Sequence, residues 1–484
     1  MDTLEKWSQP AWLWATLLVV TGAPRLLLAF LLPNPDGDAY AYLNTIHAWR
    51  ESLVAGTFTI KTLRDFWLPL YQFICALIST AINHPVYVSK TVSAASGVGI
   101  CILVFLISLR LTSNRAVSVV AALLVSLNPL HILYSAFSMT EIPHAFLVLG
   151  SLYAALTRRW MIAAVCAALA GFTRVESWML IALLPAFEFV VRGRIPWRTI
   201  VVLLVAPLSW LYICWAATGD FLFYFHMRSL YIRDHYTAVA GYGNLTSDRL
   251  WWNGSKLVHA ANPAVLLGCF VGAGMWNAWK DRLDVIAVAV CFFSYLGFLV
   301  VAFLSGNQPE IWDRYGLLSF ATGTPLAAWT YLQITRGRPR LATVLAAMSL
   351  AVCVTEAQGQ IEDARGTIKN TSAKQIIANS LHRYSRENSG IRILCDDPKI
   401  PAMASISPDH FVTSAAFRSP EREAILAEID RLKIDYIVYQ KADARSVLRH
   451  FPELQQGIPL PRFVLDFPQF RTDADESAYL YKLK

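Results

Sequence analysis

The sequence predicts a mainly α-helical protein that crosses a membrane many times and ends in a small α/β domain. Of its 484 residues, 55% are hydrophobic and only 16% are charged, whereas a typical soluble domain carries about 25% charged residues. Apolar runs suited to transmembrane helices recur as far as Thr355, and beyond it the composition becomes that of a soluble domain. We therefore expect a membrane domain over 1–356, a helical connection over 357–390 and a soluble outer α/β domain over 391–484.

About eleven apolar segments are expected to cross a hydrocarbon core of about 30 Å, singly or as helical hairpins. They are 11–32, 87–109, 116–133, 143–157, 160–173, 177–191, 199–217, 263–279, 285–304, 315–334 and 341–355. The first has 22 residues and no small-residue cleavage site, so it is interpreted as a helix rather than a signal peptide. The spans are plain and uninterrupted, and Arg25 is the main charge within one.

Basic residues gather in alternate connections between these spans. Thirteen of the 24 in residues 1–356 are Lys6, Arg110, Arg115, Arg158, Arg159, Arg192, Arg194, Arg198, Lys280, Arg282, Arg336, Arg338 and Arg340. The positive-inside rule assigns these short loops to the cytoplasm. The N-terminus is then cytoplasmic and the C-terminus outside, in the periplasm for a bacterial inner membrane or in the lumen for an endoplasmic reticulum membrane.

Two outer segments are expected to form helices that do not span. Counting Phe66–Ile82 as a span would place the arginine clusters outside, so we interpret it as an interfacial helix, with a twelfth span as the alternative. Asp38–Val54 is typical of a short amphipathic helix. A second large outer loop runs from 219 to 262 and is aromatic and basic.

The C-terminal domain combines strand and helix patterns. The expected strands are Ile391–Cys395, Asp435–Gln440, Arg462–Phe467 and Ala478–Leu483. Pro420–Leu432 is predicted to be a helix with Ser419 as its N-cap.

Several function classes are disfavoured by composition. The net charge of +8 comes without a basic cluster or basic helix face, so nucleic-acid binding is not indicated. Seven of the eight cysteines lie in apolar runs, which excludes a disulfide framework. No cysteine or histidine spacing indicates zinc.

Charged residues are expected on the outer side at the ends of several spans. They are Asp36 and Asp38 after the first span, Glu141 before the fourth, Arg174 and Glu176 before the sixth, Arg228 and Arg233 in the second outer loop, and Arg314 with Tyr315 at the tenth. Each has a simpler interpretation, as a turn, a favourable first-turn acid or an arginine that reaches lipid head groups. Their coincidence at four helix ends on one side favours a functional site.

The order of these motifs resembles the GT-C-type membrane glycosyltransferases, in particular protein O-mannosyltransferases and the lipid A aminoarabinose transferase. The matching segments are Gly37-Asp38-x3-Tyr42-Leu43, Trp67-Leu68-Pro69-Leu70-Tyr71, Asn128-Pro129-Leu130-His131, Met139-Thr140-Glu141, Phe172-Thr173-Arg174-Val175-Glu176 and Arg314-Tyr315. The resemblance covers roughly 1–340. It implies a polyprenyl-phosphate sugar donor and an aspartate base in the first outer loop, and the spacing to Tyr42 favours Asp38 over Asp36. Where relatives carry a basic residue before two prolines, this chain offers Lys61 or Arg64 instead.

The chemistry of such a transfer suits these residue types. A lipid phosphate is already a good leaving group, so the reaction needs a carboxylate base for the acceptor hydroxyl and cations for the phosphate. The base would be Asp38, and the candidate phosphate ligands are Arg174, Arg228, Arg233 and Arg314 with Lys61 or Arg64. Glu141 would bind hydroxyls or orient an arginine, and Glu176 and Tyr315 complete the candidate substrate-binding set.

Alternatives remain at this stage. The resemblance to oligosaccharyltransferases suggests that Asp36, Asp38 and Glu141 hold Mg²⁺ or Mn²⁺, although we expect no cofactor. The acceptor is a glycan, a lipid or a protein. A lipid-linked sugar flippase or transporter, or a polysaccharide polymerase or ligase, would fit a similar outer face.

Overall fold

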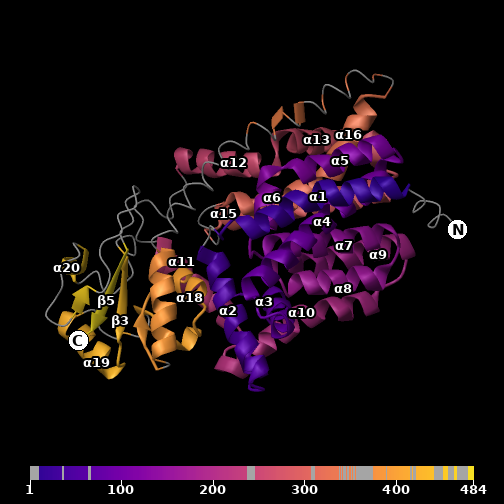
Figure 1. Cartoon of the computed structure of the whole chain (residues 1–484). Helices are drawn as coiled ribbons and strands as arrows, with labels where there is room; N and C mark the ends of the chain where they lie inside the picture. Colours follow the sequence, from indigo (N-terminus) through magenta and orange to yellow (C-terminus); the bar gives the residue numbers. More distant parts are fainter. Residues whose placement is uncertain are drawn as a thin grey trace. The chain divides into compact units, whose positions relative to one another are not determined.

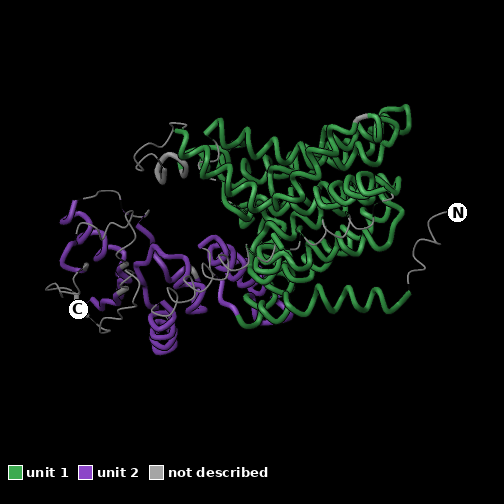
Figure 2. The backbone as a smooth tube through the Cα atoms, turned by 90° about the horizontal axis from the view of Figure 1, so that it is seen from above, with its two compact units in different colours: residues 1–31, 57–78, 86–360 green, residues 32–56, 79–85, 361–484 purple. Residues whose placement is uncertain are grey.

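The computed structural model describes residues 10–34, 37–63, 67–236, 246–306, 311–336, 374–388, 390–414, 417, 421–440, 451–455, 463–465 and 478–483, with single positions between 338 and 355. The chain divides into two compact units (Figure 2). Unit 1 comprises residues 1–31, 57–78 and 86–360. Unit 2 comprises residues 32–56, 79–85 and 361–484.

Unit 1 is helical in its described residues (Figure 1). Its elements are α1 (Ala11–Leu31), η2 (Ile60–Leu63), α3 (Leu70–Ala81), α4 (Pro85–Thr112), α5 (Arg115–Leu127), α6 (Pro129–Ser135), α7 (Glu141–Leu156), α8 (Trp160–Gly171), η3 (Val175–Met179), α9 (Leu180–Arg192), α10 (Trp197–Thr218), α11 (Phe223–Tyr236), α12 (Ser247–Ala261), α13 (Pro263–Gly274), α14 (Trp276–Trp279), α15 (Leu283–Leu304), η4 (Asp313–Tyr315) and α16 (Gly316–Ile334). The predicted mainly helical class is confirmed. Only single positions are described in the last predicted span, 341–355.

Four of the described helices are long and apolar enough to cross a membrane, namely α1, α4, α10 and α15. The number rises to six if two bent pairs each count as one span, α5 with α6 at 63° and α12 with α13 at 89°. The first bend corrects the expectation that the span over 116–133 is uninterrupted, whereas α12 belongs to the predicted outer loop 219–262. The segment predicted to be an interfacial helix is helical as α3, whose 12 residues reach about 18 Å, less than the hydrocarbon core; its place at the interface stays a prediction.

The break between α5 and α6 explains the buried arginine of α1. Asn128 accepts a hydrogen bond from the His131 backbone N–H at 2.9 Å, which starts α6 after the bend. The bend leaves carbonyls at the end of α5 without helical partners. Arg25 donates to the carbonyls of Ser126 and Val125 at 3.3 and 3.4 Å, and its Nη2 lies 2.9 Å from His131 Nδ1. Arg25 therefore has a structural role, because it supplies hydrogen bonds to the carbonyls that the break at the end of α5 leaves without helical partners.

Close approach between helices fixes the start of α16, where two candidate site residues lie. A Cβ atom added to Gly316 would lie 2.4 Å from the Cβ of Ala260 in α12. Only glycine fits there, because real Cβ atoms do not approach so closely. Small residues at helix contacts are typical of packing inside membranes.

Unit 2 contains a five-stranded sheet in the order β2-β1-β3-β5-β4. The strands are β1 (Ile393–Leu394), β2 (Phe411–Val412), β3 (Tyr436–Gln440), β4 (Phe463–Leu465) and β5 (Ala478–Leu483). The first three pair in parallel, and β5 pairs antiparallel with both β3 and β4. The four predicted strands are confirmed: β5 has the predicted bounds, and β1, β3 and β4 are shorter in the described residues than predicted. Strand β2 was not predicted.

Helices cover both faces of this sheet. The helix over residues 374–387 contributes Ile377 and Leu381 to one apolar cluster, and α19 (Arg422–Arg431) contributes Ile425 and Ile429 to the other. Neighbouring residues of β3 alternate between the clusters, as expected for a strand buried on two faces. The N-cap of α19 is Glu421, and the predicted N-cap Ser419 lies outside the described residues. Shorter elements are α18 (Lys399–Ala404), η5 (Pro408–His410) and α20 (Pro452–Gln455).

The helix that follows the first span also belongs to unit 2. It is α2 (Gly37–Val54), which matches the predicted helix. Asn44 donates to the Pro398 carbonyl at 2.9 Å, and Glu51 accepts from Ser407 at 2.8 Å. Segments from opposite ends of the chain therefore pack together in this unit.

Candidate active site

Three short segments of unit 1 place charged side chains around one pocket. Glu141 is the first residue of α7, Arg174 precedes η3 and Arg314 lies in η4. The pocket is lined by Glu141, His144, Arg174, Glu176, Tyr295, Phe298, Leu299, Arg314, Tyr315, Leu318 and Ser319. Five of the sequence-predicted residues therefore meet, although they are separated by up to 174 positions in the chain.

Arg174 joins two carboxylates in this cluster. Its Nη1 donates to Glu141 Oε1 at 3.0 Å, and its Nη2 donates to Glu176 Oε1 at 2.9 Å. Arg314 Nε lies 3.5 Å from the same Glu141 oxygen. The formal charges of two arginines and two glutamates thus cancel. Because each charge is paired, these four side chains can be buried.

The charges of this cluster are held strongly. Burial alone would raise the pKa of Glu176, but the adjacent Arg174 guanidinium brings it down to about 2. Burial lowers the pKa of Arg174, and the two glutamates outweigh this effect, so its pKa lies well above the ordinary value. Both side chains are therefore ionised throughout the physiological pH range.

Glu141 has one carboxylate oxygen left for another partner. Its side chain is 6% exposed, and its Oε2 is buried without a hydrogen-bond partner among the described residues. An unpaired buried oxygen is costly, about 1–3 kcal/mol. Such an atom in a pocket wall can accept a hydrogen bond from a substrate hydroxyl.

Tyr315 organises the two arginines. The Arg174 guanidinium carbon lies 5.2 Å from the centre of its ring, and that of Arg314 lies 5.4 Å from it. Both distances are within the range of cation–π attraction. Tyr315 therefore acts as a platform that orients the guanidinium groups.

A second hydrogen-bonded group, formed by His144, Ser177 and Tyr295, adjoins the charged cluster. It was not predicted from the sequence. His144 Nε2 lies 2.6 Å from Ser177 Oγ, which is 3.0 Å from the Tyr295 hydroxyl. His144 follows Glu141 by three residues in α7, so helical periodicity could have placed it on the same face. Nothing in the sequence indicates that Ser177 and Tyr295 lie beside it.

Arg228 lies in α11 near this cluster. Its Nη1 donates to the Tyr224 hydroxyl at 3.4 Å. Burial lowers the pKa of Arg228, whereas Tyr224 and Glu176 raise it, and the net effect is an increase. Its electrostatic interaction with Glu176 and Tyr315 brings a third arginine to the same region of unit 1.

The remaining predicted residues are distributed elsewhere. Asp38 lies in the first turn of α2 in unit 2, and Lys61 lies in η2 of unit 1. Arg233 belongs to α11, but its side chain is outside the described part. Asp36 and Arg64 lie outside the described residues.

The metal alternative has no complete site in the described part of the chain. No group of three His, Cys, Asp or Glu side chains there is arranged to hold an ion. The alternative set includes Asp36, which is not among those residues.

Comparisons with known proteins bear on the fold. No family model matches the sequence, and no curated protein matches it either. Among solved structures, ArnT from Cupriavidus metallidurans bound to undecaprenyl phosphate matches with a TM-score of 0.57 at 12% identity, over 97% of this chain and 98% of that one. The same protein in the apo state gives 0.58 at 11% identity, over 97% of both chains.

The oligosaccharyltransferase from Archaeoglobus fulgidus, in complex with Zn and sulfate, matches with a TM-score of 0.52 at 12% identity, over 87% of this chain and 67% of that one. At these identities the likeness concerns the fold. The chain has the GT-C fold of membrane glycosyltransferases, and the resemblance predicted from its motifs is confirmed at that level.

Proposed function

We propose that the protein is a membrane glycosyltransferase that moves a sugar from a polyprenyl-phosphate donor to a hydroxyl acceptor on the outer face. The observation that carries this proposal is the buried cluster of Glu141, Arg174, Glu176 and Arg314 at one end of a GT-C fold. One protein with this fold binds undecaprenyl phosphate, which supports the donor class. The acceptor class is a glycan, a lipid or a protein.

Asp38 is the general base in this proposal. Its carboxylate takes the proton from the acceptor hydroxyl, whose oxygen attacks C1 of the sugar from the face opposite the phosphate. The bond between C1 and the phosphate oxygen breaks, and the polyprenyl phosphate leaves with the electron pair. The sugar is transferred with inversion in a single displacement.

The arginines divide into two roles. Arg174 is engaged by Glu141 and Glu176, so we assign it a positioning role. Arg314 and Arg228, with Lys61, Arg64 and Arg233, are the proposed ligands of the donor phosphate, where arginine offers bidentate contacts. Glu141 accepts a hydrogen bond from a sugar or acceptor hydroxyl through Oε2.

A transporter or flippase is the second candidate function. The two bent helix pairs favour it, because broken helices are common in transporters. The break between α5 and α6 is filled by Arg25, however, which gives it a structural explanation. The cluster at a helix end favours the transferase.

The lipid that co-purifies with the protein tests the proposal. The Asp38→Asn variant should retain a polyprenyl-phosphate sugar, because it removes the base and keeps the phosphate ligands. Mass spectrometry of lipids extracted from this variant and from wild type would identify it. Extraction of membrane phospholipids alone, from protein prepared with the donor present, would contradict the donor class.

The proposed location is a bacterial inner membrane, with a cytoplasmic N-terminus and a periplasmic C-terminus. An endoplasmic reticulum membrane is the counterpart in a eukaryote.

A further inference from the structure

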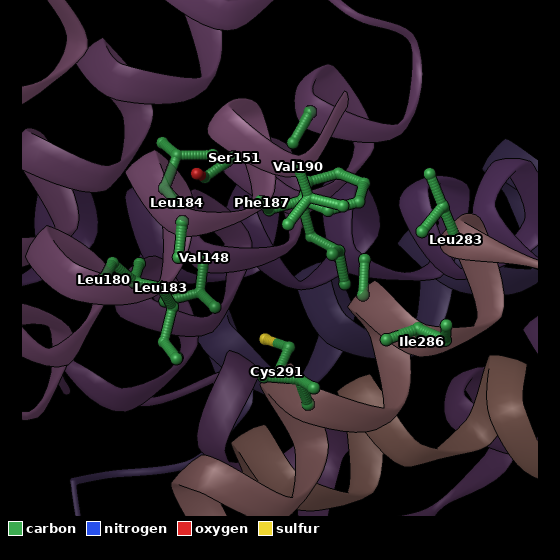
Figure 3. Close-up of a pocket in the computed structure, with 15 residues that line it drawn as sticks. Val148, Ser151, Leu180, Leu183, Leu184, Phe187, Val190, Leu283, Ile286 and Cys291 are labelled. Carbon is green, nitrogen blue, oxygen red and sulfur yellow. The ribbon is translucent and has the colours of Figure 1, made fainter. Parts of the chain in front are cut away.

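A basic pocket lies at the end of unit 1 opposite the Glu141 cluster, and an apolar groove runs from beside it toward that cluster. Helix α7 begins at Glu141 and ends at Leu156, and its 16 residues extend about 24 Å. The groove is lined by the second half of α7 together with α9 and α15, and Figure 3 shows side chains from these helices around a common space. Neither feature is used in the proposed transfer.

The groove has the depth of one membrane leaflet. Its lining on α9 runs from Leu180 to Val190, about 15 Å along the helix, which is half of a hydrocarbon core of about 30 Å. It encloses about 220 Å³. It reaches the surface, because Val190 is 62% and Val290 43% exposed. These dimensions suit one acyl chain.

The basic pocket lies at the ends of α8, α9 and α10. Its volume is about 660 Å³, and four arginines line it: Arg159, Arg192, Arg194 and Arg198. Glu188, the only acid in its lining, accepts hydrogen bonds from Arg192 and Thr199. The other three arginines have no carboxylate partner among the described residues, so the pocket is strongly positive.

Two aromatic rings in edge-to-face contact lie between the groove and the basic pocket. Trp160 lines the pocket and Phe187 lines the groove, and their ring centres are 5.6 Å apart. The Arg158 guanidinium carbon lies 5.3 Å from the Phe187 ring and 5.8 Å from the Trp160 ring. Arg158 Nη2 donates to Asp284, while its Nη1 is buried without a hydrogen-bond partner among the described residues. The guanidinium that carries this buried donor therefore lies against one ring from each space.

We propose that this surface binds an anionic glycerophospholipid of the leaflet at this end, which is the end predicted to face the cytoplasm. Its phosphate occupies the arginine pocket and one acyl chain occupies the groove. Three unpaired arginines favour an anionic head group, and basic pockets between transmembrane helices bind such head groups. A leaflet-deep groove fits an acyl chain rather than the longer chain of a polyprenyl lipid.

The head-group contact is tested by native mass spectrometry of the full-length protein titrated with dioleoyl phosphatidylglycerol or dioleoyl phosphatidylcholine. Wild type should prefer the anionic lipid. The variant Arg194→Gln/Arg198→Gln should bind phosphatidylglycerol about thirtyfold more weakly, since each arginine near a charged lipid surface contributes about fivefold. The matched control is Arg336→Gln/Arg338→Gln, which removes the same charge from another exposed loop. An equal loss in both variants would mean diffuse attraction and would overturn the site.

The groove is tested separately. Ala186→Phe fills it from an exposed position of α9, and Ala182→Phe adds the same ring to an exposed position outside the groove lining. Only Ala186→Phe should weaken phosphatidylglycerol binding. Equal binding by both variants would overturn the acyl-chain assignment. Displacement of phosphatidylglycerol by undecaprenyl phosphate, with the same sensitivity to Ala186→Phe, would assign the groove to the donor chain instead.

Discussion

Arg174 and Glu141 form a buried ion pair of 3.0 Å across 33 residues of sequence. The pair joins the start of α7 to the segment before η3, and the same guanidinium binds Glu176. It therefore fixes the relative positions of two carboxylates in the pocket wall. The preorganisation of this wall is the basis of the proposed site.

Loss of Arg174 is expected to destabilise unit 1. Arg174→Gln leaves the buried Glu176 carboxylate without its cation and leaves Glu141 with Arg314 alone, and breaking a buried ion pair typically costs about 3–5 kcal/mol. The double variant Arg174→Gln/Glu141→Gln should recover part of this loss. The melting temperature in detergent measures both effects.

The matched control is Arg110→Gln, which breaks the more exposed pair with Asp284 and should cost about 1 kcal/mol or less. Similar losses for Arg174→Gln and Arg110→Gln would show that the Arg174 cluster is not specially stabilising.

Acid stability should depend on Glu176. Its pKa is about 2 in the folded protein, below an ordinary value near 4.3, so an unfolded chain binds its proton at a higher pH. Its contribution to stability is complete above about pH 5 and falls as the pH decreases toward 2. The melting temperature of wild type should therefore drop more steeply between pH 5 and pH 3 than that of Glu176→Gln. Parallel curves would contradict the assigned pKa.

The membrane orientation has a direct test. Reporter fusions at 112–114 and 337–339 should report a cytoplasmic location, because arginines surround these loops. Fusions at 233–250 and at the C-terminus should report the outside. A cytoplasmic C-terminus would mean that Phe66–Ile82 is a span and that the outer site is wrongly placed.

The C-terminal domain should influence the helix that carries Asp38. In unit 2, α2 contacts this domain through Asn44 and Glu51, so Asn44→Ala combined with Ser407→Ala should lower the transfer rate severalfold. Donor binding, measured with undecaprenyl phosphate, should be unchanged. Deletion of 357–484 should likewise reduce acceptor use more than donor binding. Loss of donor binding in a folded deletion variant would assign the donor site to this domain.

The sequence was informative where one physical property decides the structure. Apolar length predicts α4 and α15, and charges at helix ends predict Glu141, Arg174 and Arg314. The bend at Asn128 was not predicted because a run of apolar residues has the same hydrophobic pattern in a continuous helix and in a broken one. The contact between Ser177 and Tyr295 depends on which helices are neighbours, and β2 has only two residues. Neither can be read from local patterns.

The Asp36→Asn variant is the control for the assignment of Asp38 as the catalytic base. Asp36→Asn should reduce the rate less than Asp38→Asn if only Asp38 accepts the proton. Equal loss in both variants, together with inhibition of wild type by EDTA, would support the metal alternative instead.

The turnover of Asp38→Asn tests the central claim most directly. Asparagine keeps the size of the side chain but cannot accept the acceptor proton, so the rate with the native donor lipid should fall roughly 10²- to 10⁴-fold. Binding of undecaprenyl phosphate should remain, because the proposed phosphate ligands are other residues. Turnover within about threefold of wild type would contradict the assignment of Asp38 as the base, since loss of a true base costs far more.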